Sequence, residues 1–136
     1  MDLMRSITIA ASGLKAQSGR MRVIAENLAN ADSTARVPGG DPYRRKVPTF
    51  GATFDSTLDA QVVELGRIER DRSPFREEYD PGNPAADARG YVKLPNVNSL
   101  VEQMDMREAQ RAYEANLNVV GAARRMIART LDILRG

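Results

Sequence analysis

The sequence contains no cysteine and no histidine. Without cysteine the chain can form no disulfide and offers no thiolate nucleophile or thiolate ligand. Without histidine it lacks the side chain used most often as a general acid or base, which is also a frequent ligand of zinc and other transition metals. These two absences exclude many classes of enzyme. We therefore expect no catalytic residue, no cofactor site and no metal site.

Large aromatic side chains are also scarce, because the 136 residues include no tryptophan, three phenylalanines and four tyrosines. The apolar surface is carried mainly by Leu, Ile, Val, Met and Ala. Such side chains suit the apolar stripe of a helix that packs on another helix better than they suit an aromatic-centred pocket. We expect no small-molecule substrate.

No part of the chain has a strong excess of one charge. The net charge of +2 divides into +2 over residues 1–30, −1 over 31–97 and +1 over 98–136. A nucleic-acid-binding protein usually gathers Lys and Arg on one face or in one tail. The charge distribution therefore gives no reason to expect a nucleic-acid partner.

Long hydrophobic runs are missing as well. The longest purely apolar run is Val119–Ala123, far short of the ~20 residues that span a bilayer. At the N-terminus, the acidic Asp2 and the polar Ser6 and Thr8 do not fit the pattern of a secretory signal. We expect a soluble or peripheral protein whose first residues are mature sequence.

What is present at the N-terminal end is one apolar stripe with alternating spacings of four and three residues, which is typical of an amphipathic helix. It consists of Leu3, Ile7, Ala10, Leu14, Met21, Ile24 and Leu28, and is interrupted only by Gln17. The spacing predicts a helix from residue 3 to 29, which at ~1.5 Å per residue is ~40 Å long.

A second stripe of the same kind occupies the C-terminal end. Its members are Met106, Gln110, Tyr113, Leu117, Val120, Arg124, Ile127, Leu131 and Leu134. The pattern predicts a helix over 99–134, beginning at Ser99 and Glu102, whose S-x-x-E spacing is that of a capping box.

The middle of the chain, residues 31–97, holds all seven prolines and most of the turn-forming residues. Alternation of apolar and polar residues predicts short extended segments at Tyr43–Val47, Gln61–Glu69, Phe75–Tyr79 and Tyr91–Leu94. Pro48 lacks a backbone N–H, so we expect no long strand around it.

These patterns predict an α+β fold with two domains. Residues 1–30 and 98–136 form a discontinuous helical domain, a long antiparallel pair of terminal helices resembling a coiled coil, while residues 31–97 form a small β-rich, loop-rich middle module. Two helices with no tryptophan, disulfide or metal are only marginally stable, because chain entropy roughly cancels the gain from burying one stripe. We therefore expect the helices to self-assemble between subunits.

The predicted assembly interface consists of the residues of both stripes: Leu3, Ile7, Ala10, Leu14, Met21, Ile24, Leu28, Tyr113, Leu117, Val120, Arg124, Ile127, Leu131 and Leu134. The polar Arg124 either pairs with a carboxylate of a neighbouring subunit or extends its charged end into solvent. Asn27, Asn116 and Asn118 are candidates for hydrogen bonds between helices. Gly13 either allows close helix approach or merely loosens its helix.

The run Arg44-Arg45-Lys46 has two interpretations. It can bind phosphate or an acidic neighbouring subunit, or it can be a solvated edge that discourages unwanted strand pairing. We favour the solvated edge.

Several strings resemble the bacterial flagellar rod and hook protein family. Ala11–Gln17 and Arg22–Thr34 are similar to the N-terminal signature of this family. The strings that narrow the resemblance to its proximal rod proteins are Ser73–Arg76, Tyr79–Pro84, Gly90–Val92, Pro95–Asn98 and Arg111–Asn116.

The resemblance implies a structural subunit of the flagellar basal-body rod, which stacks helically with copies of itself and other rod proteins into a drive shaft that transmits torque. It further implies a place in the periplasmic part of the basal body near the inner-membrane ring, and transit through the flagellar type III export apparatus without signal cleavage. The alternative is a helical adaptor or chaperone-like binding module that uses the same stripes on a foreign helix.

Overall fold

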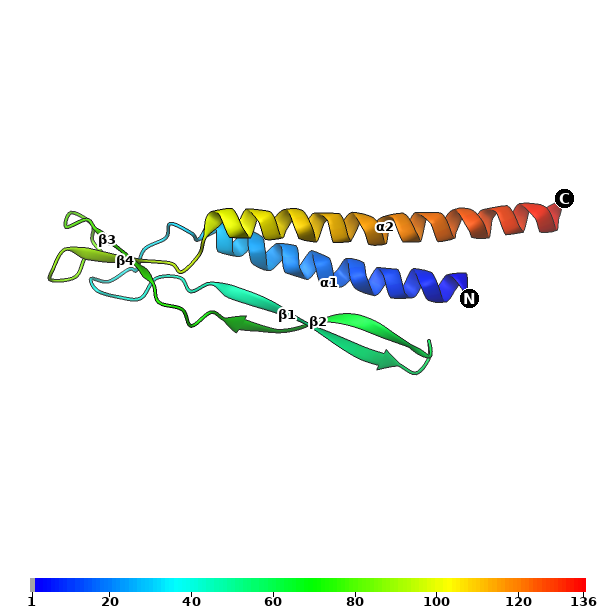
Figure 1. The fold of residues 1–136 in the computed structure, drawn as a ribbon, viewed down its shortest axis with the longest axis horizontal. Coiled ribbons are helices and arrows are strands. Elements are labelled where there is room, and N and C mark those ends of the chain that lie inside the picture. Colours follow the sequence, from blue (N-terminus) through cyan, green and yellow to red (C-terminus); the bar gives the residue numbers. More distant parts are fainter. Residues whose placement is uncertain (1) are drawn as a thin grey trace. The chain divides into compact units, whose positions relative to one another are not determined.

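The chain begins and ends with a long helix, and four strands lie between the two helices in the sequence (Figure 1). The structure is a computed structural model that describes residues 2–136. The elements in chain order are α1 Leu3–Ala29, β1 Lys46–Asp55, β2 Ala60–Arg70, β3 Arg76–Tyr79, β4 Tyr91–Leu94 and α2 Ser99–Arg135. The predicted α+β class, with terminal helices around a small β region, is confirmed.

Contacts within the chain divide it into two units, each of which contains a part of both helices. The first unit takes in the chain up to Met21, with Thr49–Arg67 and Arg107–Gly136. The second comprises Arg22–Pro48 and Ile68–Met106. The predicted division into a helical domain and a middle module remains a prediction.

The helix bounds agree with the sequence pattern to within one residue, but one cap differs. At the start of α1, Asp2 Oδ1 accepts a hydrogen bond from the Met4 amide over 3.0 Å. At the start of α2, Asn98 Oδ1 accepts from the Leu100 amide over 3.1 Å. The predicted capping box of Ser99 and Glu102 is therefore wrong, because Asn98 caps the helix and Glu102 is turned into the interior.

In the first unit the two helices run antiparallel and very close together. A Cβ atom placed on Gly13 would lie 2.7 Å from Asn116 Nδ2, so a larger residue here would require the Asn116 side chain to move. The fully buried apolar residues of this unit are all alanines: Ala10, Ala16, Ala109 and Ala123. Small side chains thus lie at the most deeply buried positions, while the larger apolar side chains of this unit are at most half-buried.

The part of the β1–β2 hairpin in this unit lies on α1. Leu65 packs over Gly19, where an added Cβ atom would be 2.5 Å from Leu65 Cδ2. At the hairpin turn the Arg5 guanidinium donates to the Asp59 carbonyl.

The second unit holds the larger apolar core, which consists of Val23, Ile24, Ala31, Ala85, Val92 and Val97. Its strands β3 and β4 pair antiparallel, in a register that runs from Arg76 opposite Leu94 to Tyr79 opposite Tyr91. Val92 is buried while Tyr79 and Tyr91 remain exposed at the end of this pair that the connecting segment joins.

All four predicted extended segments overlap strands, although the first strand was misjudged. β1 spans ten residues and includes Pro48, so the expectation of no long strand there is wrong. β1 and β2 form a sheet of two strands, in which each strand has an unpaired edge. A proline is tolerated where its nitrogen faces such an edge.

Gly90 is expected to be the glycine least tolerant of substitution. Its φ of 85° lies in the left-handed region, and an added Cβ atom would be 2.9 Å from Tyr79 Cε2. We expect Gly90→Ala to lower the free energy of unfolding by about 1–2 kcal/mol, measured by urea denaturation. Gly82→Ala, whose Cβ atom would meet only Asp80 Oδ1 at 3.8 Å, is the matched control and should be near neutral.

Candidate functional site: a buried polar junction and an exposed helix surface

Glu102, in the first turn of α2, is the most deeply buried acidic side chain of the second unit, with 1% of its surface exposed. Its Oε1 accepts a hydrogen bond from Arg45 Nε. Its Oε2 accepts from Asn27 Nδ2 of α1 over 3.3 Å. One carboxylate therefore links α2 to α1 and to the segment that leads into β1. We call the cluster of Asn27, Tyr43, Arg45, Asp71 and Glu102 the polar junction.

Arg45 is the hub of this junction. Besides Glu102, its guanidinium pairs with Asp71 Oδ2 at 3.3 Å and lies 3.9 Å from Asp105 Oδ2. Burial by itself would lower the pKa of Arg45, but the hydrogen bond and the charge of Glu102, together with Asp71, outweigh it and raise the pKa above its usual value. Arg45 is thus held in its ionised form.

Asn27, with 1% of its surface exposed, uses both ends of its amide. Its Oδ1 accepts from the Tyr43 hydroxyl over 2.7 Å and from the Lys46 amide over 3.0 Å. Its Nδ2 donates to the Lys46 carbonyl over 2.8 Å as well as to Glu102. The prediction that Asn27 bonds between helices is confirmed, and the same side chain also fixes the start of β1.

The other two residues of the run Arg44-Arg45-Lys46 also bind groups of the same chain. Arg44 Nη1 donates to the Asp71 carbonyl over 2.8 Å, and its guanidinium lies 4.1 Å from the centre of the Phe75 ring. Lys46 Nζ pairs with Glu26 Oε1 at 2.6 Å. The favoured interpretation of this run as a solvated edge is therefore wrong, because all three cations bind groups of the same chain. The hydrophobic pattern could not reveal this, since the partners lie far apart in the sequence.

The phenol of Tyr43 should lose its proton at a higher pH than an ordinary tyrosine. Burial, followed by the nearby charges of Glu26 and Glu102, raises the pKa of its phenol from 10.0 to about 12, against a smaller opposing effect of Arg70. A group whose pKa is higher in the folded state stabilises the fold fully below the unfolded pKa and loses that effect as pH rises through the folded pKa. Stability should therefore fall between about pH 10 and about pH 12. Urea denaturation at several pH values checks this, and Tyr43→Phe should flatten the curve in that window.

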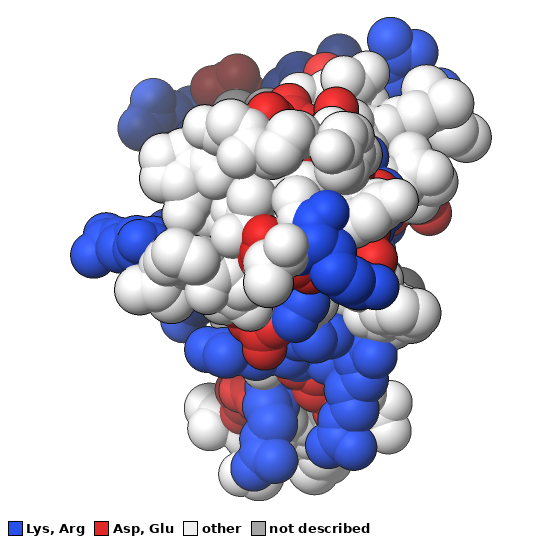
Figure 2. Space-filling model, turned by 90° about the vertical axis from the view of Figure 1, so that its left-hand side faces the viewer, with Lys and Arg blue, Asp and Glu red and all other residues white. Residues whose placement is uncertain are grey.

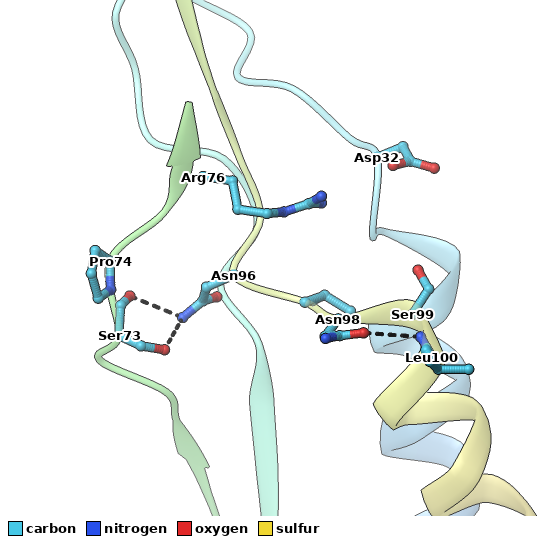
Figure 3. Close-up of a pocket in the computed structure, with 9 residues that line it drawn as sticks. Asp32, Ser73, Pro74, Arg76, Asn96, Asn98, Ser99 and Leu100 are labelled. Atoms are coloured by element: carbon cyan, nitrogen blue, oxygen red, sulfur yellow. Dashed lines mark hydrogen bonds between the residues drawn. The ribbon is translucent and has the colours of Figure 1, made fainter. Parts of the chain in front are cut away.

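A shallow pocket of about 460 Å³ lies in the same unit, beside the start of α2 (Figure 3). Asn96, which lines it, donates to the Ser73 carbonyl over 3.1 Å and to Ser73 Oγ over 3.2 Å. Arg76 donates to the carbonyls of Ala31 and Pro95. The polar groups here bind other parts of the chain, and they bring together no nucleophile with a general base.

Across residues 2–136, no cluster of three or more side chains suited to a metal ion is found. The helices of this described part also lack a segment long and apolar enough to cross a membrane.

The two stripes predicted as an interface differ in how far the chain itself covers them. On α1, Ala10 and Ile24 are buried, and the half-buried members are Leu3, Ile7, Leu14, Met21 and Leu28. On α2, Tyr113, Val120 and Ile127 are half-buried. Leu117, Arg124, Leu131 and Leu134 are exposed. The stripes therefore serve partly in packing within the chain, and their role between subunits remains a prediction.

A further exposed strip was not singled out by the four-three pattern. Val119, Met126 and Ile133 recur every seven residues on α2 and are 48%, 54% and 79% exposed. The strip follows a regular heptad, so the sequence did contain a signal for it. The strip lies on α2 beside the half-buried residues Tyr113, Val120 and Ile127 of the same helix.

Sequence profiles of two flagellar families match the chain. The family described as "Flagella basal body rod protein" matches residues 7–36, and that described as "Flagellar basal body rod FlgEFG protein C-terminal" matches residues 88–133. Among curated proteins, the flagellar basal-body rod protein FlgC of Agrobacterium fabrum is 53% identical, over 93% of this chain and 91% of that protein. The chain belongs to the FlgC family of flagellar basal-body rod proteins.

More distant members of the FlgC family match over nearly the whole chain. The FlgC protein of Borreliella burgdorferi is 42% identical over 100% of both chains, and that of Bacillus subtilis is 38% identical over 98% of this chain and 99% of its own. The family resemblance stated from the signature strings is confirmed. The chain is a structural rod subunit of the flagellar basal body, like the relatives it matches.

In this FlgC-family protein, the surface of the second unit carries charges of both signs. Figure 2 shows Lys and Arg side chains next to Asp and Glu side chains, beside a broad uncharged area. Several of these charges are already paired within the unit, as in the contact of Lys93 Nζ with Asp41 Oδ1 at 3.2 Å. In this view several Lys and Arg side chains gather in the lower part of the face.

Proposed function

We propose that this chain assembles with copies of itself and with other rod proteins into a helical drive shaft, using the exposed apolar surface of α2. The observation that carries the proposal is the set of large apolar side chains left uncovered on the C-terminal part of this helix: Leu117, Val119, Met126, Leu131, Ile133 and Leu134. Exposed apolar side chains that gather in patches on a soluble protein mark protein interfaces, and the number of them on this part of one helix supports such a role.

The polar junction supports a role in transmitting torque. A drive shaft requires that force applied to one element is passed on without bending. In the second unit, Arg45 and Asn27 bind α1, α2 and β1 through directed hydrogen bonds and ion pairs. Buried polar contacts of this kind favour one arrangement of the elements over its alternatives.

The proposal also includes the setting that the family implies. The chain lies in the periplasmic part of the rod near the inner-membrane ring, passes through the flagellar type III export apparatus, and has no catalytic activity. The absence of cysteine and histidine supports the last point, as does the structural role of the relatives.

Deletion of the gene tests this function directly. Electron microscopy of isolated basal bodies should show rings without a rod, and expression of the wild-type chain should restore the rod. Intact rods in the deletion strain would contradict the proposal. Restored assembly by a truncated chain that lacks residues 115–136 would contradict the role of the exposed helix surface.

The ends of the helices should be mobile in the isolated chain. In the first unit the buried apolar residues are only alanines and the larger ones are at most half-buried, so packing offsets chain entropy less than in the second unit. We expect amide protons of α1 up to Met21 and of α2 from Arg107 to exchange much faster than those of the second unit. Hydrogen exchange with mass spectrometry measures this, and full protection of both helices in a monomer would contradict it.

A further inference from the structure

We propose that the C-terminal part of α2 in one copy docks on the end of the β1–β2 hairpin in a second copy. This inference rests on the proposed self-assembly and specifies which two surfaces meet. It is carried by the apolar side chains that both surfaces expose and by their opposite charges.

The hairpin surface lies in the first unit and is apolar and acidic. Phe50, Phe54 and Val63 are 44%, 59% and 42% exposed. From residue 49 to residue 66 the chain carries three acidic residues, Asp55, Asp59 and Glu64, and no basic residue, which gives a charge of −3.

The helix surface lies in the same unit and has the complementary composition. From residue 115 to residue 136 it carries four arginines and one aspartate, which gives a charge of +3. These charged residues are Arg124, Arg125, Arg129, Asp132 and Arg135. Met126 and Ile133 provide exposed apolar side chains beside them. Opposite charges that surround apolar contacts favour the correct encounter and disfavour pairing of like surfaces.

The contacts of α1 indicate that the two surfaces meet between copies rather than within one chain. Ser12 and Gly19 of α1 contact the hairpin, through the Val63 amide at 3.4 Å and through Leu65. Gly13 of the same helix contacts Asn116 of α2, and Arg20 pairs with Glu108 at 3.5 Å. Because α1 already binds both elements of its own chain, the exposed parts of each remain available to another copy.

A contact between two different surfaces of the same protein is heterologous. Such contacts repeat without limit unless the rotation closes a ring, and they generate open helical arrays. Each added copy uses one of its two surfaces and leaves the other free, so this single contact type is sufficient for growth along an axis.

Site-specific cross-linking tests the contact, because the chain has no cysteine of its own. A full-length Val63→Cys variant is mixed with a full-length Met126→Cys variant and treated with a short bismaleimide. We expect a dimer that contains one chain of each kind, whereas each variant alone should stay largely uncross-linked. The matched control is Arg107→Cys, an exposed position nearer the start of α2, which should not cross-link to Val63→Cys.

Charge variants give an independent test by sedimentation velocity. Arg125→Glu with Arg129→Glu disables the helix surface, and Phe54→Asp with Val63→Asp disables the hairpin surface without giving it a positive charge that the altered helix could bind. Each double variant alone should remain monomeric, with affinity at least tenfold weaker than wild type, while an equimolar mixture should form dimers and nothing larger. Arg107→Glu with Arg111→Glu changes the charge of α2 equally and should associate like wild type.

The outcomes separate this contact from the proposed function. If wild type assembles and the mixed variants neither cross-link nor dimerise, the contact is wrong although self-assembly stands. If wild type remains monomeric at every concentration, self-assembly itself fails and this inference fails with it. Circular dichroism confirms that each variant keeps its helices.

Discussion

Glu102→Ala is expected to lower the free energy of unfolding by about 3–5 kcal/mol, the cost of breaking a buried ion pair. The substitution leaves Arg45 without its closest carboxylate and removes the acceptor for one N–H of Asn27. Asp71 and Asp105 still face Arg45, so we expect a value toward the lower end of this range. Urea denaturation followed by circular dichroism measures the change.

A graded set of variants separates charge from hydrogen bonding. Glu102→Gln keeps an acceptor for Asn27 but removes the charge, and should cost less than Glu102→Ala. The exposed pair of Arg20 and Glu108 provides the control, because Glu108 is 71% exposed and Glu108→Ala should cost only about 0–1 kcal/mol. Equal losses of unfolding free energy for Glu102→Ala and Glu108→Ala would show that the buried contacts of Glu102 stabilise the fold no more than an exposed ion pair does.

Met126→Asp combined with Ile133→Asp is expected to abolish rod assembly and swimming. Both side chains are more than half exposed, so the changes should leave the fold of the isolated chain intact. In an apolar interface between subunits, an unpaired carboxylate costs about 3 kcal/mol or more, which weakens each contact more than a hundredfold. Swimming in soft agar and electron microscopy of basal bodies measure the effect.

Asn118→Asp is the matched control for this experiment. It adds one negative charge to the same helix at another exposed position, and should leave swimming close to wild type. Unfolding of the Met126→Asp, Ile133→Asp chain in isolation would assign the strip to packing within the chain. Normal rods built from that chain would rule out the strip as an assembly surface.

The helices were predictable because each repeats a local pattern for many turns. The stripes of α1 and α2 predicted the bounds of both helices to within one residue. Pro95 indicated that α2 could not begin earlier. β1 was not predictable in full, because Pro48 argued against it and only pairing with β2 explains its length.

The polar junction was largely beyond the reach of sequence reasoning. Asn27 was identified as a candidate for bonding between helices, but Glu102 looked like a capping residue and Arg45 like part of a solvated run. Arg45 and Glu102 bind each other but lie 57 residues apart in the chain. No local sequence pattern connects two residues at that separation. For the exposed strip, the sequence indicated Met126 and Ile133 only as residues that widen the apolar face of α2, and their heptad spacing with Val119 was not recognised beside the stronger four-three stripe.

The helix contact of the first unit, whose buried apolar residues are alanines, has a consequence for the proposed growth of the rod. Because larger side chains of this contact are only half-buried within one chain, we expect neighbouring copies in the proposed array to add to the stabilisation of this unit. A copy in the interior of the array has neighbours on both sides, whereas the last copy has them on one. The tip is therefore the least stable position, where a subunit can still leave, and each newly arriving chain fixes the one before it in place.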